Sequence, residues 1–233
     1  TSPSGGRRSR LRLVFVAAKL YKRLYSIRRG GRMDAEVGDR LTRATRSPAL
    51  LDTRDASAFA ACHLIGAVNI SQTELRNRSG ELPPATDAAG LTVVVTADNS
   101  AAVLEALNAW TIIDAIEENK LLWDAARRLE LIEIGAAPFD RFLWRPSPHL
   151  APACALVEQW VPAHTCGGRR AIDLGCGRGR DAIWLASRPG WSVVGIDNQS
   201  FFLSHLREFA SRQRLGDDKI RGVCLDLYSQ ASW

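Results

Sequence analysis

The 233-residue chain has no apolar run that approaches the roughly 20 residues of a membrane-spanning helix. Its five cysteines are scattered and include no Cys-x-x-Cys pair, and its four histidines lack metal-ligand spacing. Cys154, His164 and Cys166 come closest to a ligand cluster, but they lie in a segment that contains Pro and Gly. These absences predict a protein of a reducing compartment, with no membrane span and no metal site.

Acidic residues are absent from residues 1–33, which hold ten of the 31 Lys and Arg residues. The remaining chain has 21 basic against 25 acidic residues. The basic arm is therefore the reason that the whole chain has a pI of about 9.4. The arm is Arg-rich, Ser-containing and partly amphipathic, and in this it resembles a mitochondrial targeting segment. Its charge also suits RNA phosphates.

We therefore expect a protein of mitochondria or another organelle matrix, with a cytoplasmic location as the alternative. The expected partner of the arm is RNA or a ribonucleoprotein, and the alternative is a solvated helix packed on its own body. The basic residues expected to contact RNA are Arg7, Arg8, Arg10, Arg12, Lys19, Lys22, Arg23, Arg28 and Arg29.

Residues 171–181 combine a short apolar run, three glycines at alternate positions and the start of a helical pattern. Glycine permits a turn with positive φ and, having no Cβ, lets a ligand touch the main chain. A second apolar run over 191–196 ends in Asp197. In a doubly wound sheet an acid at this strand end holds ribose hydroxyls beside the first turn. Dinucleotides and S-adenosylmethionine both fit this order of strand, helix, strand and acid.

The spacing Gly-x-Gly-x-Gly, with Asp173 two residues before the first glycine, resembles the first motif of the class I S-adenosylmethionine-dependent methyltransferases. The resemblance places the glycines and Asp173 at the methionine end of S-adenosylmethionine, Asp197 at its ribose and Asp226 at its adenine amino group. The cofactor-binding residues that it implies are Asp173, Gly175, Cys176, Gly177, Gly179, Asp197, Asn198 and Asp226. No catalytic residue that positions a methyl acceptor is identifiable.

The predicted strands of this region cover 171–174, 192–196 and 223–225, and its helices cover 180–186 and 200–215. Continuously apolar strands are expected where helices cover both faces of a sheet. The family sheet has more than these three strands, so we expect the domain to be incomplete in this chain. Either the protein continues beyond residue 233, which we favour, or a partner covers the apolar surface.

An earlier segment has a buried run at 49–52 that ends in Asp52-Thr53-Arg54, then a short helix, His63 and a second short strand from Ala67. This order resembles the rhodanese-like domains and covers residues 34–131. The resemblance implies that Asp52 and Arg54 tie loops around the sheet. It also implies that His63 has a packing role and is not a catalyst.

Sulfur-transferring relatives carry a cysteine directly after the strand that corresponds to residues 91–95. This chain has Thr96-Ala97-Asp98-Asn99-Ser100 instead, without a cysteine or a closing arginine, and Asp98 would repel an anion. The domain is therefore predicted to be a scaffold that binds protein partners and not a sulfurtransferase. Asn99 or Ser100 is expected to cap a helix over 103–110.

Residues 112–131 are predicted to be helical because they combine strong helix formers with apolar spacing. Residues 132–168 are predicted to be a linker, stiff and aromatic over 139–150, with a short helix over 153–160. The expected fold class is α/β, with a rhodanese-like domain followed by an incomplete Rossmann-like methyltransferase domain over 169–233.

Three functions remain open. The first is a methyltransferase acting in or on an organellar ribonucleoprotein, for example in ribosome assembly. The second is a non-catalytic assembly factor of that particle. The third is a small-molecule methyltransferase with a thiol or metalloid acceptor.

Overall fold

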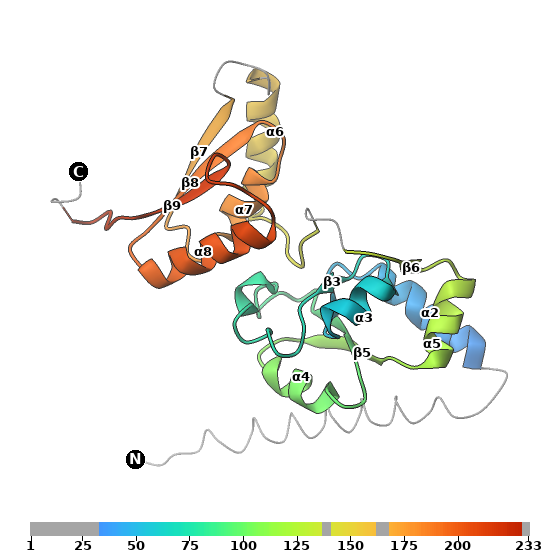
Figure 1. The fold of residues 1–233 in the computed structure, drawn as a ribbon. Coiled ribbons are helices and arrows are strands. Elements are labelled where there is room, and N and C mark those ends of the chain that lie inside the picture. The colour runs from blue at the N-terminus through green and yellow to red at the C-terminus, as the bar shows by residue number, and fades with distance from the viewer. Residues whose placement is uncertain (1–32, 137–140, 162–167, 230–233) are drawn as a thin grey trace, which may run out of the picture. The chain divides into compact units, whose positions relative to one another are not determined.

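The computed structural model describes residues 33–136, 141–161 and 168–229, so residues 1–32 of the predicted basic arm lie outside the described residues. The chain divides into two compact units between residues 137 and 138 (Figure 1). The predicted linker is therefore shared between the two units, and each unit is an α/β body with a parallel sheet. No helix in the described ranges is long and apolar enough to cross a membrane.

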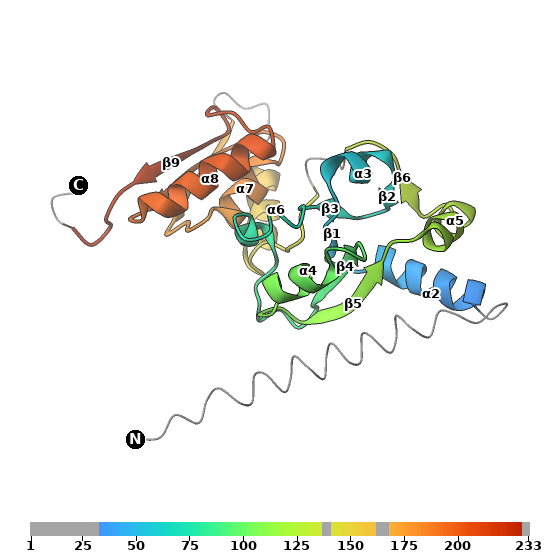
Figure 2. The same ribbon diagram turned by 60° about the horizontal axis from the view of Figure 1, so that its bottom comes forward.

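A four-stranded parallel sheet forms the centre of the first unit (Figure 2). Its strands follow the order β3 (Val68–Asn69), β1 (Leu50–Asp52), β4 (Leu91–Val95) and β5 (Ile112–Glu117). All five residues of β4 are buried, because β4 lies inside the sheet and both of its faces are covered. Parallel neighbours need long crossovers, and helices provide two of them: α3 (Ala56–Ala61) and α4 (Ser100–Ala106).

Two further helices of this unit, α2 (Met33–Thr45) and α5 (Lys120–Arg128), contact each other. Both contribute to one hydrophobic core together with α3 and the sheet, through Leu41, Leu50, Phe59, Val94, Ile116, Leu122 and Ala126. A short antiparallel pair, β2 (His63–Leu64) with β6 (Ile132–Glu133), and a 3-10 turn at Ser79–Glu81 complete the unit. Because β6 pairs with β2, residues 132 and 133 belong to this domain and not to a linker.

The prediction of one helix over 112–131 is wrong, since residues 112–117 form strand β5 and only 120–128 are helical. Ile112, Ile113 and Ile116 are β-branched and fit a strand better than a helix. In the structure these residues form a strand that pairs in parallel with β4. Asn119 then starts α5, because its side chain accepts a hydrogen bond from the Leu122 amide at 2.9 Å.

The second unit contains a three-stranded parallel sheet in the order β7 (Arg169–Leu174), β8 (Trp191–Asp197) and β9 (Ile220–Cys224). Its helices are α6 (Leu150–Trp160), α7 (Arg180–Ala186) and α8 (Ser200–Arg212). The predicted alternation of strands and helices is confirmed here. The strands begin one to three residues earlier than predicted, and α8 ends before the predicted residue 215.

One face of this sheet carries the core of the second unit. Ile183 of α7, Leu203 and Leu206 of α8, and Val193 of β8 are buried together. On β7 the opposite face is open, since Ile172 is 66% exposed and Leu174 is 63% exposed. The apolar strands are therefore not covered on both faces within the described part of the chain.

The segment before α6 is packed and not extended as a connector. Trp144 is buried, and its ring centroid lies 5.2 Å from that of Phe209 and 4.6 Å from that of Phe142. Aromatic side chains bury large areas, so this segment joins the core of the second unit. The described residues of the range 132–168, which was predicted to be a linker, therefore belong to the two units.

A salt bridge joins α6 to the rest of the second unit. Arg188 donates from Nε and Nη2, which lie on one edge of its guanidinium, to the two oxygens of Glu158 at 2.9 and 2.8 Å, and the Trp191 indole donates to the same carboxylate at 2.9 Å. These hydrogen bonds lower the pKa of Glu158 to about 2. The carboxylate therefore remains charged over the whole physiological range.

Candidate functional site

The turn between β7 and α7, residues 175–179, is called the glycine turn below. Gly175, Gly177 and Gly179 have φ values of 71°, 54° and 80°. These values lie in the left-handed region that residues with a Cβ rarely adopt. The turn is anchored to β8, because the amides of Gly175 and Cys176 both donate to the Ile196 carbonyl, at 2.8 and 2.9 Å.

The three glycines have different surroundings. A Cβ built on Gly175 or Gly177 would meet no atom within 4 Å, so the main chain at these two positions faces open space. A Cβ on Gly179 would collide with the Leu206 side chain. Gly179 therefore serves the close packing of α7 on α8, and Gly175 and Gly177 form the part of the turn that a ligand can reach.

Asp197, at the end of β8, points its carboxylate toward the glycine turn. One oxygen, Oδ2, accepts a hydrogen bond from the Gly177 amide at 2.8 Å. The other, Oδ1, accepts one from the Gln199 amide at 2.9 Å. Each carboxylate oxygen has a second lone pair, so the group retains capacity to accept hydrogen bonds from ribose hydroxyls.

Two further carboxylates lie near the turn. Burial raises the pKa of Asp173, and the negative charges of Asp181 and Asp197 raise it further, although the Ala182 amide donates to it and opposes the shift. Asp181, in the first turn of α7, accepts a hydrogen bond from the Ser147 amide at 3.0 Å. This contact brings the segment before α6 to the mouth of the turn.

Asp181 was not among the predicted cofactor residues. The sequence did offer a signal for Asp181: it is an acid in the first helical turn after a glycine loop, and a helix N-terminus favours negative charge. The bond to Ser147 was not predictable, because it joins residues that are 34 apart in the chain.

Cys176 lies inside the turn, with its sulfur close to Gly195 of β8. Burial raises the pKa of the Cys176 thiol to about 12, with further contributions from the charges of Asp173 and Asp197. The thiol is therefore neutral near pH 7. Cys176 packs between the strand and the turn, and its neutral thiol is not a nucleophile.

The structure places the last two predicted residues at the edge of this site. Asn198 is exposed, and its carbonyl accepts a contact from the Cys224 thiol at 3.8 Å. Asp226 is exposed and accepts the Tyr228 amide at 2.9 Å. The Leu225 amide donates to the Asp197 carbonyl at 3.0 Å, which keeps this loop beside the end of β8.

The glycine turn, Asp173 and Asp197 are thus brought together, whereas the carboxylate of Asp226 is engaged in its own local turn. The adenine contact assigned to Asp226 stays a prediction. Within the described ranges, no group of three or more His, Cys, Asp or Glu residues is arranged to hold a metal ion.

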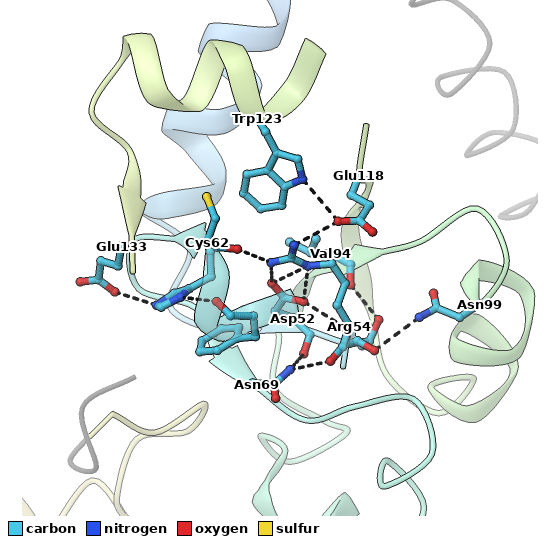
Figure 3. Close-up of polar contacts among 12 residues, drawn as sticks. Asp52, Arg54, Cys62, Asn69, Val94, Asn99, Glu118, Trp123 and Glu133 are labelled. Atoms are coloured by element: carbon cyan, nitrogen blue, oxygen red, sulfur yellow. Dashed lines mark hydrogen bonds and ion pairs between the residues drawn. The ribbon is translucent and has the colours of Figure 1, made fainter. Parts of the chain in front are cut away.

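A second polar centre lies in the first unit, around Arg54 (Figure 3). The Arg54 side chain is 4% exposed, and its guanidinium donates to Asp52, Glu118 and the Cys62 carbonyl, with its shortest contact, 2.6 Å, to Asp52. The Trp123 ring lies over it, 4.4 Å from the guanidinium carbon. Burial opposes the charge, but the hydrogen bonds and charge of Asp52 and Glu118 outweigh it and raise the pKa of Arg54.

This Arg54 cluster joins the end of β1, the segment after α3 and the start of α5. The structural role expected for Asp52 and Arg54 is therefore confirmed. His63 stacks on Phe59, with ring centroids 3.8 Å apart, and its Nδ1 donates to the Phe59 carbonyl at 2.9 Å. Its Nε2 lies 3.2 Å from Glu133, so His63 is held in a packing position, as predicted.

The loop after β4 is closed by its own residues. Asn99 Oδ1 accepts the Thr96 amide at 2.9 Å, and Thr96 Oγ1 accepts the Asn99 amide at 3.1 Å. The Asn99 side chain therefore makes no cap to α4, contrary to the expectation, and Ser100 is the first residue of α4. The amides of Thr96 and Asn99 are thus bonded within the loop, and the loop contains no thiol.

Two protein-family models match the chain. The model of the rhodanese-like domain matches residues 35–119, and the model of the methyltransferase domain matches residues 171–231. The first unit therefore carries a rhodanese-like domain, and the second carries a methyltransferase domain with the Rossmann-like arrangement of parallel strands and helices. Both resemblances and the α/β fold class are confirmed.

Among curated proteins, the chain is similar to Uncharacterized protein UNK4.09 of Schizosaccharomyces pombe, with 25% identity over 183 residues. The match covers 74% of this chain and 52% of that protein, so this chain spans about half the length of the curated relative.

Two solved structures are also similar. A TehB-like SAM-dependent methyltransferase from Corynebacterium glutamicum is 25% identical, with a TM-score of 0.25, over 36% of this chain and 44% of that chain. A human methyltransferase 10 domain containing protein is 20% identical, with a TM-score of 0.30, over 35% and 40%. These TM-scores are too low to support a conclusion about substrate.

Proposed function

We propose that the second unit binds S-adenosylmethionine at the glycine turn and serves methyl transfer. One observation carries the proposal: Gly175 and Gly177 present bare main chain to open space, and the Asp197 carboxylate lies directly beside them. An adenosyl ligand needs such a surface, with acceptors for its ribose hydroxyls and no side chain between it and the main chain.

The residues present fit this cofactor. Asp197 would accept the ribose hydroxyls, and the main chain at Gly175 and Gly177 would lie against the methionine end, near Asp173. S-Adenosylmethionine, when bound, supplies a methyl group activated by its sulfonium. Methyl transfer depends mainly on holding an acceptor in line with that group, so the contribution of these residues is to fix the position of the cofactor.

Titration calorimetry with S-adenosylmethionine on the full chain tests the proposal. We expect saturable binding with one site per chain, and S-adenosylhomocysteine should compete for the same site. A Gly177→Val variant should lose binding, because its side chain would enter the space that the cofactor occupies. Absence of heat from the unmodified chain would favour the non-catalytic assembly factor.

We further propose that the basic arm directs this protein to an organellar ribonucleoprotein, of the kind found in ribosome assembly. The support is the sequence of residues 1–33, with ten basic residues and no acid. Counterion release from RNA phosphates would supply the binding energy and would make it dependent on salt. The rhodanese-like domain, without a thiol in its loop, then serves as a protein-binding scaffold.

Removal of residues 1–32 tests the arm separately from the cofactor. Association with mitochondrial ribosomal particles should fall, and the salt dependence of RNA binding should weaken, while S-adenosylmethionine still binds. Unchanged association would exclude the arm as the RNA contact. Cofactor binding without any RNA association would favour the small-molecule methyltransferase.

A further inference from the structure

The segment that leads into α6, residues 141–149, is called the approach segment below. It is fixed to the second unit at both ends. In its first half, Trp144 is buried and its ring centroid lies 5.2 Å from that of Phe209 in α8. The helix that follows the segment is fixed as well, because Glu158 of α6 pairs with Arg188 at 2.8 Å. Both anchors serve the packing of the unit.

Between these anchors the approach segment has a contact of another kind. The Ser147 amide donates to Asp181 Oδ1 at 3.0 Å. Ser147 lies between Pro146 and Pro148, which have no amide hydrogen and restrict the backbone around it. Ser147 is exposed, so water could satisfy its amide equally well. The bond to Asp181 therefore fixes where the segment lies and contributes little to folding.

Asp181 lies beside the part of the glycine turn that a ligand can reach. It is the second residue of α7, which begins directly after Gly179. Burial raises the pKa of Asp173, and the negative charge of Asp181 is the next cause, ahead of that of Asp197. Since Coulomb interactions weaken with distance, Asp181 and Asp173 are neighbours. The approach segment is thus fastened next to the end of the turn where the methionine part of the cofactor is proposed to lie.

We propose, on the basis of the function proposed above, that Asp181 is a positioning residue for S-adenosylmethionine: through Ser147 it holds the approach segment as a wall of the cofactor site. Gly175 and Gly177 provide one surface of bare main chain. A ligand pocket must bury most of its ligand, so a second surface is needed beside the first. A wall that is already in place before the cofactor binds raises affinity, because less has to be ordered on binding.

The negative charge of Asp181 offers a second way to favour this cofactor, since the sulfonium of S-adenosylmethionine is cationic. The two roles have different requirements. Holding Ser147 needs an oxygen acceptor, which the side-chain amide of asparagine also supplies. Direct attraction needs the charge, and it would favour S-adenosylmethionine over S-adenosylhomocysteine, whose sulfur is neutral. The wall favours both ligands equally, because it acts on the parts that they share.

Titration calorimetry of the full chain with each of these two ligands tests the proposal. Asp181→Ala should weaken the binding of both by about three- to tenfold, in line with the loss of one hydrogen bond. Asp181→Asn should restore most of the affinity, because its oxygen still accepts the Ser147 amide. The control is Asp218→Ala, which removes the same charge at an exposed acid after α8 and should leave binding unchanged. Circular dichroism should show that all three variants are folded.

The Ser147 amide provides a readout that a purely structural role of Asp181 would not change. In the full chain with isotope-labelled serine, its magnetic resonance signal should move when S-adenosylmethionine is added. The Ser147→Ala variant identifies this signal, because the signal is absent from it. A signal that stays in place although the cofactor binds would overturn the wall.

The affinities separate this proposal from the function on which it rests. If Asp181→Ala binds both ligands as tightly as the unmodified chain does, the positioning role is overturned and the proposed function stands. A loss that is confined to S-adenosylmethionine, or that Asp181→Asn shares in full, would overturn the positioning role in favour of direct charge attraction. Absence of binding to the unmodified chain would overturn both proposals.

Discussion

The Gly177 amide donates a 2.8 Å hydrogen bond to Asp197, so the residue expected to hold the ribose also braces the turn beside it. Gln199 donates to the other oxygen of the same carboxylate. Asp197 therefore has a structural and a ligand-binding role, and a substitution that removes the whole carboxylate affects both.

Changing Asp197 separates these two roles when two variants are compared. Asp197→Ala removes every acceptor, so S-adenosylmethionine affinity should fall by about 10- to 100-fold, in line with about 1.5–3 kcal/mol for hydrogen bonds to a charged group. Asp197→Asn retains one acceptor for the turn but fewer for the ribose. It should lose affinity with a smaller loss of stability.

Calorimetry and urea unfolding together measure both quantities for these variants. Asp218→Ala, at an exposed acid outside the site, is the control for net charge. If Asp197→Ala binds S-adenosylmethionine as well as the unmodified chain does, the ribose assignment is wrong.

The glycines of the turn should respond differently to alanine. Gly177→Ala meets no neighbouring atom, so its cost is the unfavourable φ of 54°, about 1–2 kcal/mol. Gly179→Ala has a similar backbone cost and also collides with Leu206, which adds about 1–3 kcal/mol of overpacking. Urea unfolding followed by tryptophan fluorescence should therefore show the larger loss for Gly179→Ala. Equal losses would contradict the packing role of Gly179.

Removing the guanidinium of Arg54 should strongly destabilise the first unit. Arg54→Met leaves Asp52 buried and without its ion-pair partner, which costs about 3–5 kcal/mol for a broken buried pair. Arg127→Met breaks an exposed pair with Asp124 and should cost less than about 1 kcal/mol. Circular dichroism during urea unfolding compares the two, and similar midpoints would show that the Arg54 cluster is not a stabilising centre.

The salt bridge of Glu158 predicts an acid-sensitive second unit. The folded-state pKa of about 2 lies below the ordinary value of 4.5, so the contribution is complete above pH 4.5 and is lost as the pH falls toward 2. Glu158→Gln should lower the free energy of unfolding at pH 7, and the difference from the unmodified chain should shrink in acid. A difference that is independent of pH between 7 and 3 would exclude the charge as its source.

The local sequence was sufficient for the glycine turn and for most of the elements around it. The alternate glycines permit a turn with positive φ, which all three adopt, and the apolar runs on both sides of α7 predict strands. The absence of a cysteine after β4 was likewise visible from the sequence without a structure. By contrast, 112–117 was assigned to the wrong element, because helix-forming neighbours outweighed three isoleucines until pairing with β4 was visible.

The chain alone therefore determined the two domain types, the backbone shape of the turn and the carboxylate at the end of β8. Only the tertiary structure decided which glycine faces open space and which faces Leu206, that Trp144 belongs to a core, and that a groove lies between α8 and β9. The physical reason is range: backbone conformation depends on neighbouring residues, whereas packing and groove formation depend on residues that the fold brings together from distant positions.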